Sequence, residues 1–305
     1  MYTKILVPLD ASMAAEQIIP YLQGMLPRQS EYHLVSVLEP NMYTYAFASS
    51  EATVRDKLQG VIYDELAAYL ARVQEVLQAK GYHVHTWVAR GDAAQTIADV
   101  ATKIKADLIA MTTHGRTGFT RWALGSVADR VIQVAQQPIL LVRLSGEPPL
   151  SYAIQRVLVP LDGSALAEAA LNEARQVAQE RGATLLLVRV VEPLSSWQQA
   201  LLAESGYDTT HITQERQTEA YLYLKQIQEQ LQQVGIASET HIFTGNATET
   251  LLQLMQEEAI DLIVMSTHGL SGYSRWVYGS VAGKVLHTAT CPLLLARSVE
   301  MAGVG

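Results

Sequence analysis

The sequence of 305 residues contains a single cysteine, Cys291. One thiol excludes an intrachain disulfide and a metal site built from cysteines. Cys291 begins a short apolar run, Cys291 to Leu295, which we interpret as a buried strand. We therefore expect a small core residue here and not a reactive thiol.

Long apolar runs and positive charge are also scarce. No run is long enough to span a bilayer, and the first residues lead into a predicted strand without a signal-peptide pattern. We therefore expect a cytoplasmic protein with no membrane partner. The chain has 22 Lys and Arg against 30 Asp and Glu, a formal charge of −8. Without a basic stripe, we expect no nucleic-acid partner.

Two nucleotide-enzyme motifs are missing. There is no Gly-x-x-x-x-Gly-Lys-[Ser/Thr], and so no lysine of the kind used in rapid phosphoryl transfer. There is no Gly-x-Gly-x-x-Gly after the first strand, which argues against a dinucleotide enzyme. His114 and His268 have no acidic residue nearby to orient them and no second histidine at ligand spacing. We predict no catalytic residue and no protein-held metal.

The first half reads as alternating strands and helices. The predicted strands are 5–10, 34–38, 83–88, 107–111 and 138–142, and helices are predicted at 13–26, 54–77, 93–104 and from 126 onward. The strands are almost continuously apolar. This order and composition predict an α/β fold with a parallel sheet covered by helices on both faces.

The same elements then recur. Pro8 reappears as Pro160, Glu39 as Glu192 and Gly125 as Gly279, 152 to 154 positions later. A period this long indicates a duplicated domain and not a solenoid. We expect domains at 1–145 and 151–298, joined by a linker at Gly146–Pro149.

A glycine- and hydroxyl-rich loop occurs once in each half, between the fourth strand and the next helix. The first copy runs from Thr112 to Ser126 and the second from Ser266 to Ser280. Backbone N–H groups at such a helix start favour an anion. In an open parallel sheet, ligands bind where the strand order reverses. The sequence therefore predicts a site between this loop and the end of the first strand.

The loop resembles the phosphate-binding loop of the universal stress protein family, in its ATP-binding branch. That pattern is Gly, two residues, Gly, nine residues, then Gly-Ser or Gly-Thr. Gly115 and Gly269 match the second glycine, and Gly125-Ser126 and Gly279-Ser280 match the end. Thr112 and Ser266 occupy the position of the first glycine of the pattern, which is absent from both copies. The resemblance covers nearly the whole chain as a tandem pair. It implies a Rossmann-like five-stranded sheet of order 3-2-1-4-5 in each half.

The resemblance also implies an adenine-nucleotide site in each half. In the family the aspartate after the first strand lies beside the adenine and ribose, a backbone position in the second strand reads the adenine edge, and the glycine loop cradles the phosphates. The matching residues are Pro8, Asp10, Val37, Met111, Thr112, Gly115, Gly125, Ser126 and Val127 in the first half, and Pro160, Asp162, Val190, Met265, Ser266, Gly269, Gly279, Ser280 and Val281 in the second. Without the resemblance, these residues also fit a turn, core strand positions and a helix cap.

The implied ligand is ATP, or ADP or AMP, with Mg²⁺ accompanying the phosphates. The implied role is a regulatory module of the stress response that assembles as a homodimer of tandem chains. Two alternatives stay open, a slow ATPase and a nucleotide-free structural dimerisation module. Because the methyl group of Thr112 must be accommodated beside the ribose, we expect the second site to be the tighter.

Overall fold

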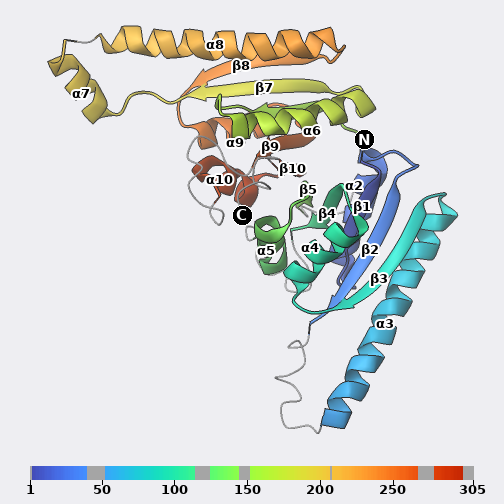
Figure 1. The fold of residues 1–305 in the computed structure, drawn as a ribbon. Coiled ribbons are helices and arrows are strands. Elements are labelled where there is room, and N and C mark those ends of the chain that lie inside the picture. The colour runs from blue at the N-terminus through green and yellow to red at the C-terminus, as the bar shows by residue number, and fades with distance from the viewer. Residues whose placement is uncertain are drawn as a thin grey trace. The chain divides into compact units, whose positions relative to one another are not determined.

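The structure is a computed structural model that describes residues 2–39, 52–113, 124–143, 152–206, 208–266 and 278–297 (Figure 1). The chain divides into two compact units, Met1–Ala153 and Ile154–Gly305. Each unit contains five strands connected by helices, and the two units differ only in the helices between the first and third strands.

The first unit consists of β1 (Lys4–Pro8), α1 (Met13–Glu16), α2 (Ile18–Met25), β2 (Glu31–Leu38), α3 (Ala52–Ala79), β3 (His83–Arg90), α4 (Ala93–Ile104), β4 (Leu108–Thr112), α5 (Ser126–Val134) and β5 (Ile139–Val142). Its strands lie in the order β3-β2-β1-β4-β5, and all of these pairs are parallel. Strand order therefore reverses between β1 and β4.

The second unit consists of β6 (Arg156–Pro160), α6 (Ala165–Arg181), β7 (Thr184–Val191), α7 (Ser196–Glu204), α8 (Thr209–Gln233), β8 (Ser238–Thr244), α9 (Ala247–Glu257), β9 (Leu262–Ser266), α10 (Ser280–Thr288) and β10 (Leu293–Ala296). Its strands lie in the order β8-β7-β6-β9-β10, again parallel. The predicted α/β fold, with strand order 3-2-1-4-5 in each half, is confirmed.

Side-chain alternation explains why helices cover both faces of each sheet. Successive residues of a strand point to opposite faces. In the first unit Tyr32 packs edge-to-face on Tyr82, on the side where α2 and α3 lie. Trp87 lies on the other side, under Lys103 of α4. Central strands have both faces covered, and Ile5, Leu6 and Val7 of β1 are fully buried.

A pair of equivalent hydrogen bonds, one in each unit, shows how closely the two units repeat each other. Gln74 of α3 donates from Nε2 to the carbonyl of Val84 across 2.7 Å, and Gln228 of α8 donates likewise to Ser238 across 2.8 Å. Both bonds fix the long helix to the edge strand. They also show that residues of α3 and α8 correspond at a difference of 154 in number.

The predicted helix at 13–26 is wrong in one respect, because it is divided into α1 and α2 at Gln17. Pro20 explains the break: proline has no N–H to donate, and its ring clashes with the carbonyl of the residue four positions earlier, Glu16. Helix α7 was not predicted. It begins with a capping box in which Ser195 and Gln198 satisfy each other's backbone groups.

Cys291 also differs from the prediction, because β10 begins two residues later at Leu293. The thiol is half-buried. Burial raises its pKa to about 12, so it is held in the unreactive thiol form.

Candidate functional site

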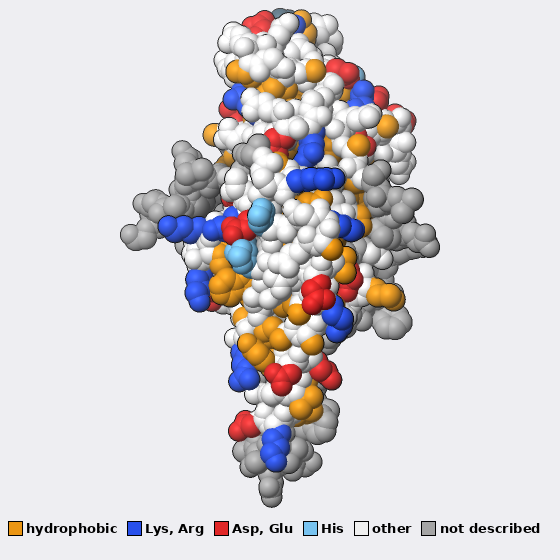
Figure 2. All heavy atoms as spheres, turned by 90° about the vertical axis from the view of Figure 1, so that its right-hand side faces the viewer, with side chains coloured by type: hydrophobic (Ala, Val, Ile, Leu, Met, Phe, Trp, Pro, Cys, Tyr) orange, Lys and Arg blue, Asp and Glu red, His pale blue; other side chains and the backbone are white. Residues whose placement is uncertain are grey.

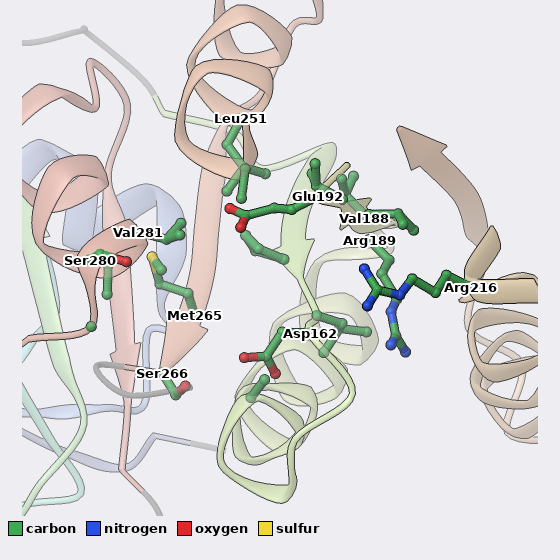
Figure 3. Close-up of a pocket in the computed structure, with 18 of the residues that line it drawn as sticks. Asp162, Val188, Arg189, Glu192, Arg216, Leu251, Met265, Ser266, Ser280 and Val281 are labelled. Carbon is green, nitrogen blue, oxygen red and sulfur yellow. The ribbon is translucent and has the colours of Figure 1, made fainter. Parts of the chain in front are cut away.

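A cavity of about 520 Å³ opens at the carboxyl ends of β6, β7 and β9 in the second unit (Figure 3). This is where strand order reverses, the usual ligand position in an open parallel sheet. Its volume is within the roughly 300–1,000 Å³ typical of small-molecule sites. Its lining includes every described residue predicted for the second site: Pro160, Asp162, Val190, Met265, Ser266, Gly279, Ser280 and Val281. Gly269 lies outside the described residues.

The turn after β6 fixes Asp162. Its Oδ1 accepts hydrogen bonds from the backbone N–H of Ser164 at 2.9 Å and from the Ser164 hydroxyl at 2.6 Å. Ser164 in turn caps α6 through the N–H of Ala167. The aspartate therefore has a structural role in the turn. Figure 3 shows the carboxylate pointing into the cavity, towards the side where Met265 and Ser266 lie.

The first unit repeats this turn. Oδ1 of Asp10 accepts from the N–H of Ser12 at 3.1 Å and from its hydroxyl at 2.6 Å, and Ser12 caps α1. Pro8 ends β1 directly before the turn, as Pro160 ends β6. Because proline cannot donate to the ladder, each first strand stops at the edge where the aspartate is needed.

The helices after the glycine loops begin without a side-chain cap. Gly125 and Gly279 are the N-cap residues of α5 and α10, and neither has a side chain to accept from the first N–H groups. By contrast, α4, α6 and α9 are capped by Asp92, Ser164 and Asn246. Uncapped N–H groups at a helix start, together with the helix dipole, favour a bound anion.

The backbone of the two cap glycines does not depend on glycine's wider conformational range. Gly125 has φ −63° and Gly279 has φ −55°, values open to any residue. Backbone conformation therefore does not require glycine at either position.

The remaining residues predicted for the first site lie at the corresponding strand ends. Met111 and Thr112 end β4 and are buried, and Val37 lies near the end of β2. Ser126 and Val127 begin α5. The N–H of Gly125 donates to the carbonyl of Thr113 across 2.7 Å, which brings the two ends of the loop together. Gly115, His114 and His268 lie outside the described residues.

The cavity is also lined by residues that were not predicted for the site, among them Arg189, Glu192, Arg216, Glu219 and Leu251. Arg189 lies in a strand whose other residues are almost all apolar, as in a buried core strand, and Arg216 lies on a long polar helix. No motif distinguishes either arginine. Only the packing of α8 against β7 brings both to the same cavity.

A metal-like cluster lies elsewhere in the first unit, where Glu31, His33 and His85 place their polar atoms within 4.8 Å of one another. Histidine and acidic side chains lie together on the face in Figure 2. Nε2 of His85 is 2.9 Å from Oε1 of Glu31, and Nε2 of His33 is 3.5 Å from Oε2.

A hydrogen bond from Trp87 disfavours a metal at this cluster. Trp87 donates its indole N–H to Nδ1 of His33 across 3.1 Å. An indole can only donate, so Nδ1 is unprotonated and the neutral ring carries its proton on Nε2. That nitrogen has no lone pair for a metal. The cluster is better explained as two imidazoles beside one carboxylate.

Within the described part of the chain, no helix combines the length and apolar character needed to cross a bilayer.

The comparisons with known proteins agree with this architecture. A model of the universal stress protein family matches residues 1–143 and again residues 153–297. The chain is 31% identical over 144 residues to universal stress protein MJ0531 of Methanocaldococcus jannaschii, covering 47% of this chain and 83% of that protein. A universal stress protein of Mycolicibacterium smegmatis is 23% identical over 317 residues, covering 96% of each.

Among solved structures, a universal stress protein from Archaeoglobus fulgidus has a TM-score of 0.72 at 19% identity. The match covers 96% of this chain and 98% of that one, and it shows a shared fold. The two separate matches to one family model show that the chain belongs to the universal stress protein family, with one family domain in each half.

Proposed function

We propose that the protein binds an adenine nucleotide, with ATP as the first candidate, at the carboxyl edge of the sheet in each unit. The observation that carries this proposal is the cavity of the second unit, which lies at the strand-order reversal and ends at the uncapped start of α10. Phosphates would bind at Gly279 and Ser280, and Mg²⁺ would be held chiefly through the phosphates. Asp162 would accept a hydrogen bond from the ribose or base.

The site supports binding better than catalysis. A general base must lie within hydrogen-bond reach of the proton it removes and must be available to take it. Oδ1 of Asp162 already accepts two hydrogen bonds from Ser164. We therefore propose a regulatory module of the cytoplasmic stress response, which acts through its nucleotide state and assembles as a homodimer of tandem chains. A slow ATPase is the alternative that turnover measurements would reveal.

Calorimetric titration of ATP into the full chain tests the proposal, together with mass spectrometry of small molecules released from the denatured protein. We expect saturable binding, and an adenine nucleotide in the released fraction. Absence of binding to ATP, ADP and AMP, with and without Mg²⁺, would instead favour the nucleotide-free structural module.

A further inference from the structure

Two arginines distinguish the second cavity from the equivalent position in the first unit. Arg189 of β7 and Arg216 of α8 both line the cavity. Strand register identifies the counterpart of Arg189: Val35 pairs with Pro8 as Val188 pairs with Pro160, so Ser36 corresponds to Arg189. The difference of 154 between α3 and α8 makes Ile62 the counterpart of Arg216.

The first unit uses the Ser36 position differently. Ser36 is 1% exposed, and its hydroxyl donates to the carbonyl of Leu9 across 2.6 Å. It is therefore a buried structural residue. The two acidic residues of the second cavity, Glu192 and Glu219, have acidic counterparts in Glu39 and Glu65. At these four positions the second unit therefore has two positive charges that the first unit lacks.

Arg189 is held in place on two sides. Its guanidinium carbon lies 5.0 Å from the centre of the Tyr223 ring. On another side it lies against Gly163, where an added Cβ would come within 2.7 Å of Nη1. The first unit has Ala11 at that place in the turn. The glycine therefore leaves space for the guanidinium beside Asp162.

The guanidinium groups of Arg189 and Arg216 lie on one side of the cavity, across Asp162 from Met265 and Ser266 (Figure 3). Among the described residues, neither arginine forms an ion pair. The start of α10 provides a separate anion-binding position at Gly279 and Ser280. The cavity therefore has two regions that can attract an anion, with Asp162 between them, and Glu192 and Glu219 also line it.

Nucleotide chemistry suggests what such an arrangement recognises. In dinucleotide sites a carboxylate accepts hydrogen bonds from a ribose hydroxyl, whereas a nearby arginine accommodates a phosphate on the ribose. Arginine suits phosphate because its planar fork can donate two parallel hydrogen bonds. The second cavity has both groups, whereas Ser36 occupies the Arg189 position in the first unit.

We propose that the second site is selective for an adenine nucleotide that has a second phosphate on its ribose, with Arg189 as the residue that determines this selectivity. The proposal rests on adenine-nucleotide binding as the function of the site. Arg216, which is exposed at the rim, adds long-range attraction to the same phosphate. The first site takes nucleotides whose ribose is unmodified.

Calorimetry on the full chain with adenosine 3′,5′-bisphosphate and with AMP tests the proposal, because the two ligands differ by one ribose phosphate. In the wild type we expect one site per chain to bind the bisphosphate about tenfold more tightly than AMP at low salt, because only the bisphosphate can accept charge-assisted hydrogen bonds from Arg189. Arg189→Ser, which introduces the residue of the first unit, should reduce this ratio to about one.

Gly163→Ala gives a second test that leaves the charge unchanged. Its methyl group would displace the guanidinium, so the ratio should again fall. Arg72→Ser is the matched control, because Arg72 also lies over a tyrosine ring, that of Tyr69 in the first unit. It should keep the wild-type ratio. If Arg189→Ser does not fold, as judged by circular dichroism, Gly163→Ala decides the question.

The outcomes separate this proposal from the general function. Equal or weaker binding of the bisphosphate, with AMP still bound, overturns the selectivity alone. A preference that survives Arg189→Ser also overturns it. If neither nucleotide binds, the proposed function fails and the selectivity fails with it.

Discussion

Ala11 and Gly163 occupy the same place in the turn after the first strand of their units, and both have a positive φ, 63° for the alanine and 84° for the glycine. This region of backbone conformation suits glycine and strains an L-residue. The repeat therefore contains the same turn in a relaxed form in the second unit and in a strained form in the first.

Replacing the strained residue should stabilise the first unit. A left-handed conformation costs an L-residue roughly 1–2 kcal/mol. The greater freedom of glycine in the unfolded chain offsets about 0.5–1 kcal/mol of this. We expect Ala11→Gly to raise the free energy of unfolding by about 0.5–1 kcal/mol in urea denaturation. The reverse change, Gly163→Ala, should lower it. If Ala11→Gly destabilises the protein, the turn is not strained as described.

The environment of His33 predicts a dependence of stability on pH. Burial lowers the pKa of His33, although the nearby Glu31 carboxylate works in the opposite direction. His33 is 6% exposed, and its Nδ1 accepts from Trp87. A second proton would have to enter at Nδ1, against the indole N–H. In the unfolded chain His33 regains its ordinary pKa of about 6.5.

Proton linkage gives the direction in which stability changes with pH. Between the folded pKa and about 6.5 the unfolded chain binds more protons, so this contribution to stability is present above about pH 6.5 and is lost as pH falls. We expect Trp87→Phe, which keeps a ring but removes the donor, to raise the pKa of His33 and weaken this pH dependence. NMR titration of the imidazole resonances measures the shift. A wild-type His33 that titrates at or above the ordinary value would contradict the argument.

The fold was predictable because its signals are local and occur twice. Apolar strands, helix-period segments and turn residues recur at nearly constant offset, so each half supports the interpretation of the other. The errors arose where one residue changes the outcome. Pro20 divides the first helix, and the capping box at Ser195 and Gln198 begins a helix in a segment without strong apolar periodicity. Both features can be found in the sequence when the effect of proline on a helix and the spacing of a capping box are considered.

The candidate site was predictable only in part. The aspartates and the glycine loops lie at strand ends, and parallel topology brings strand ends together, so their proximity follows from the sequence. Arg189 and Arg216 could not be found this way. Their position at the cavity depends on how α8 packs on β7, and on Gly163 leaving room for a guanidinium. Such contacts between distant segments have no periodic signal.

The backbone of the cap glycines permits a test of phosphate binding that preserves the helices. Because φ is −63° at Gly125 and −55° at Gly279, an L-residue fits without strain. Serine is at least as good an N-cap as glycine. We therefore expect the double change Gly125→Ser and Gly279→Ser to retain the melting temperature, while its side chains occupy the space of a phosphate and abolish ATP binding in calorimetry. Unchanged affinity would place the phosphates elsewhere.

Thr112 and Ser266 allow the two sites to be compared by exchange of a single methyl group. Thr112 ends β4 opposite Val142 and is 6% exposed, and Ser266 ends β9 opposite Ala296 and lines the cavity. The two residues therefore hold the same position in the repeat. Threonine adds a β-branched methyl group with few alternative rotamers, so a ligand against it must shift or tolerate close contact.

We predict that ATP binds the second site more tightly than the first, and that exchanging these residues changes the order. Overpacking typically costs about 1–3 kcal/mol, and 1.4 kcal/mol is tenfold in affinity. Thr112→Ser should tighten the first site, and Ser266→Thr should weaken the second by about tenfold. Both changes keep the hydroxyl group, so only the methyl differs. Calorimetric titration of each variant should resolve the two classes of site, and the double exchange should bring the affinities together or reverse them. Equal affinities in the wild type, or a first site that is tighter, would mean that the methyl group of Thr112 does not face the ligand.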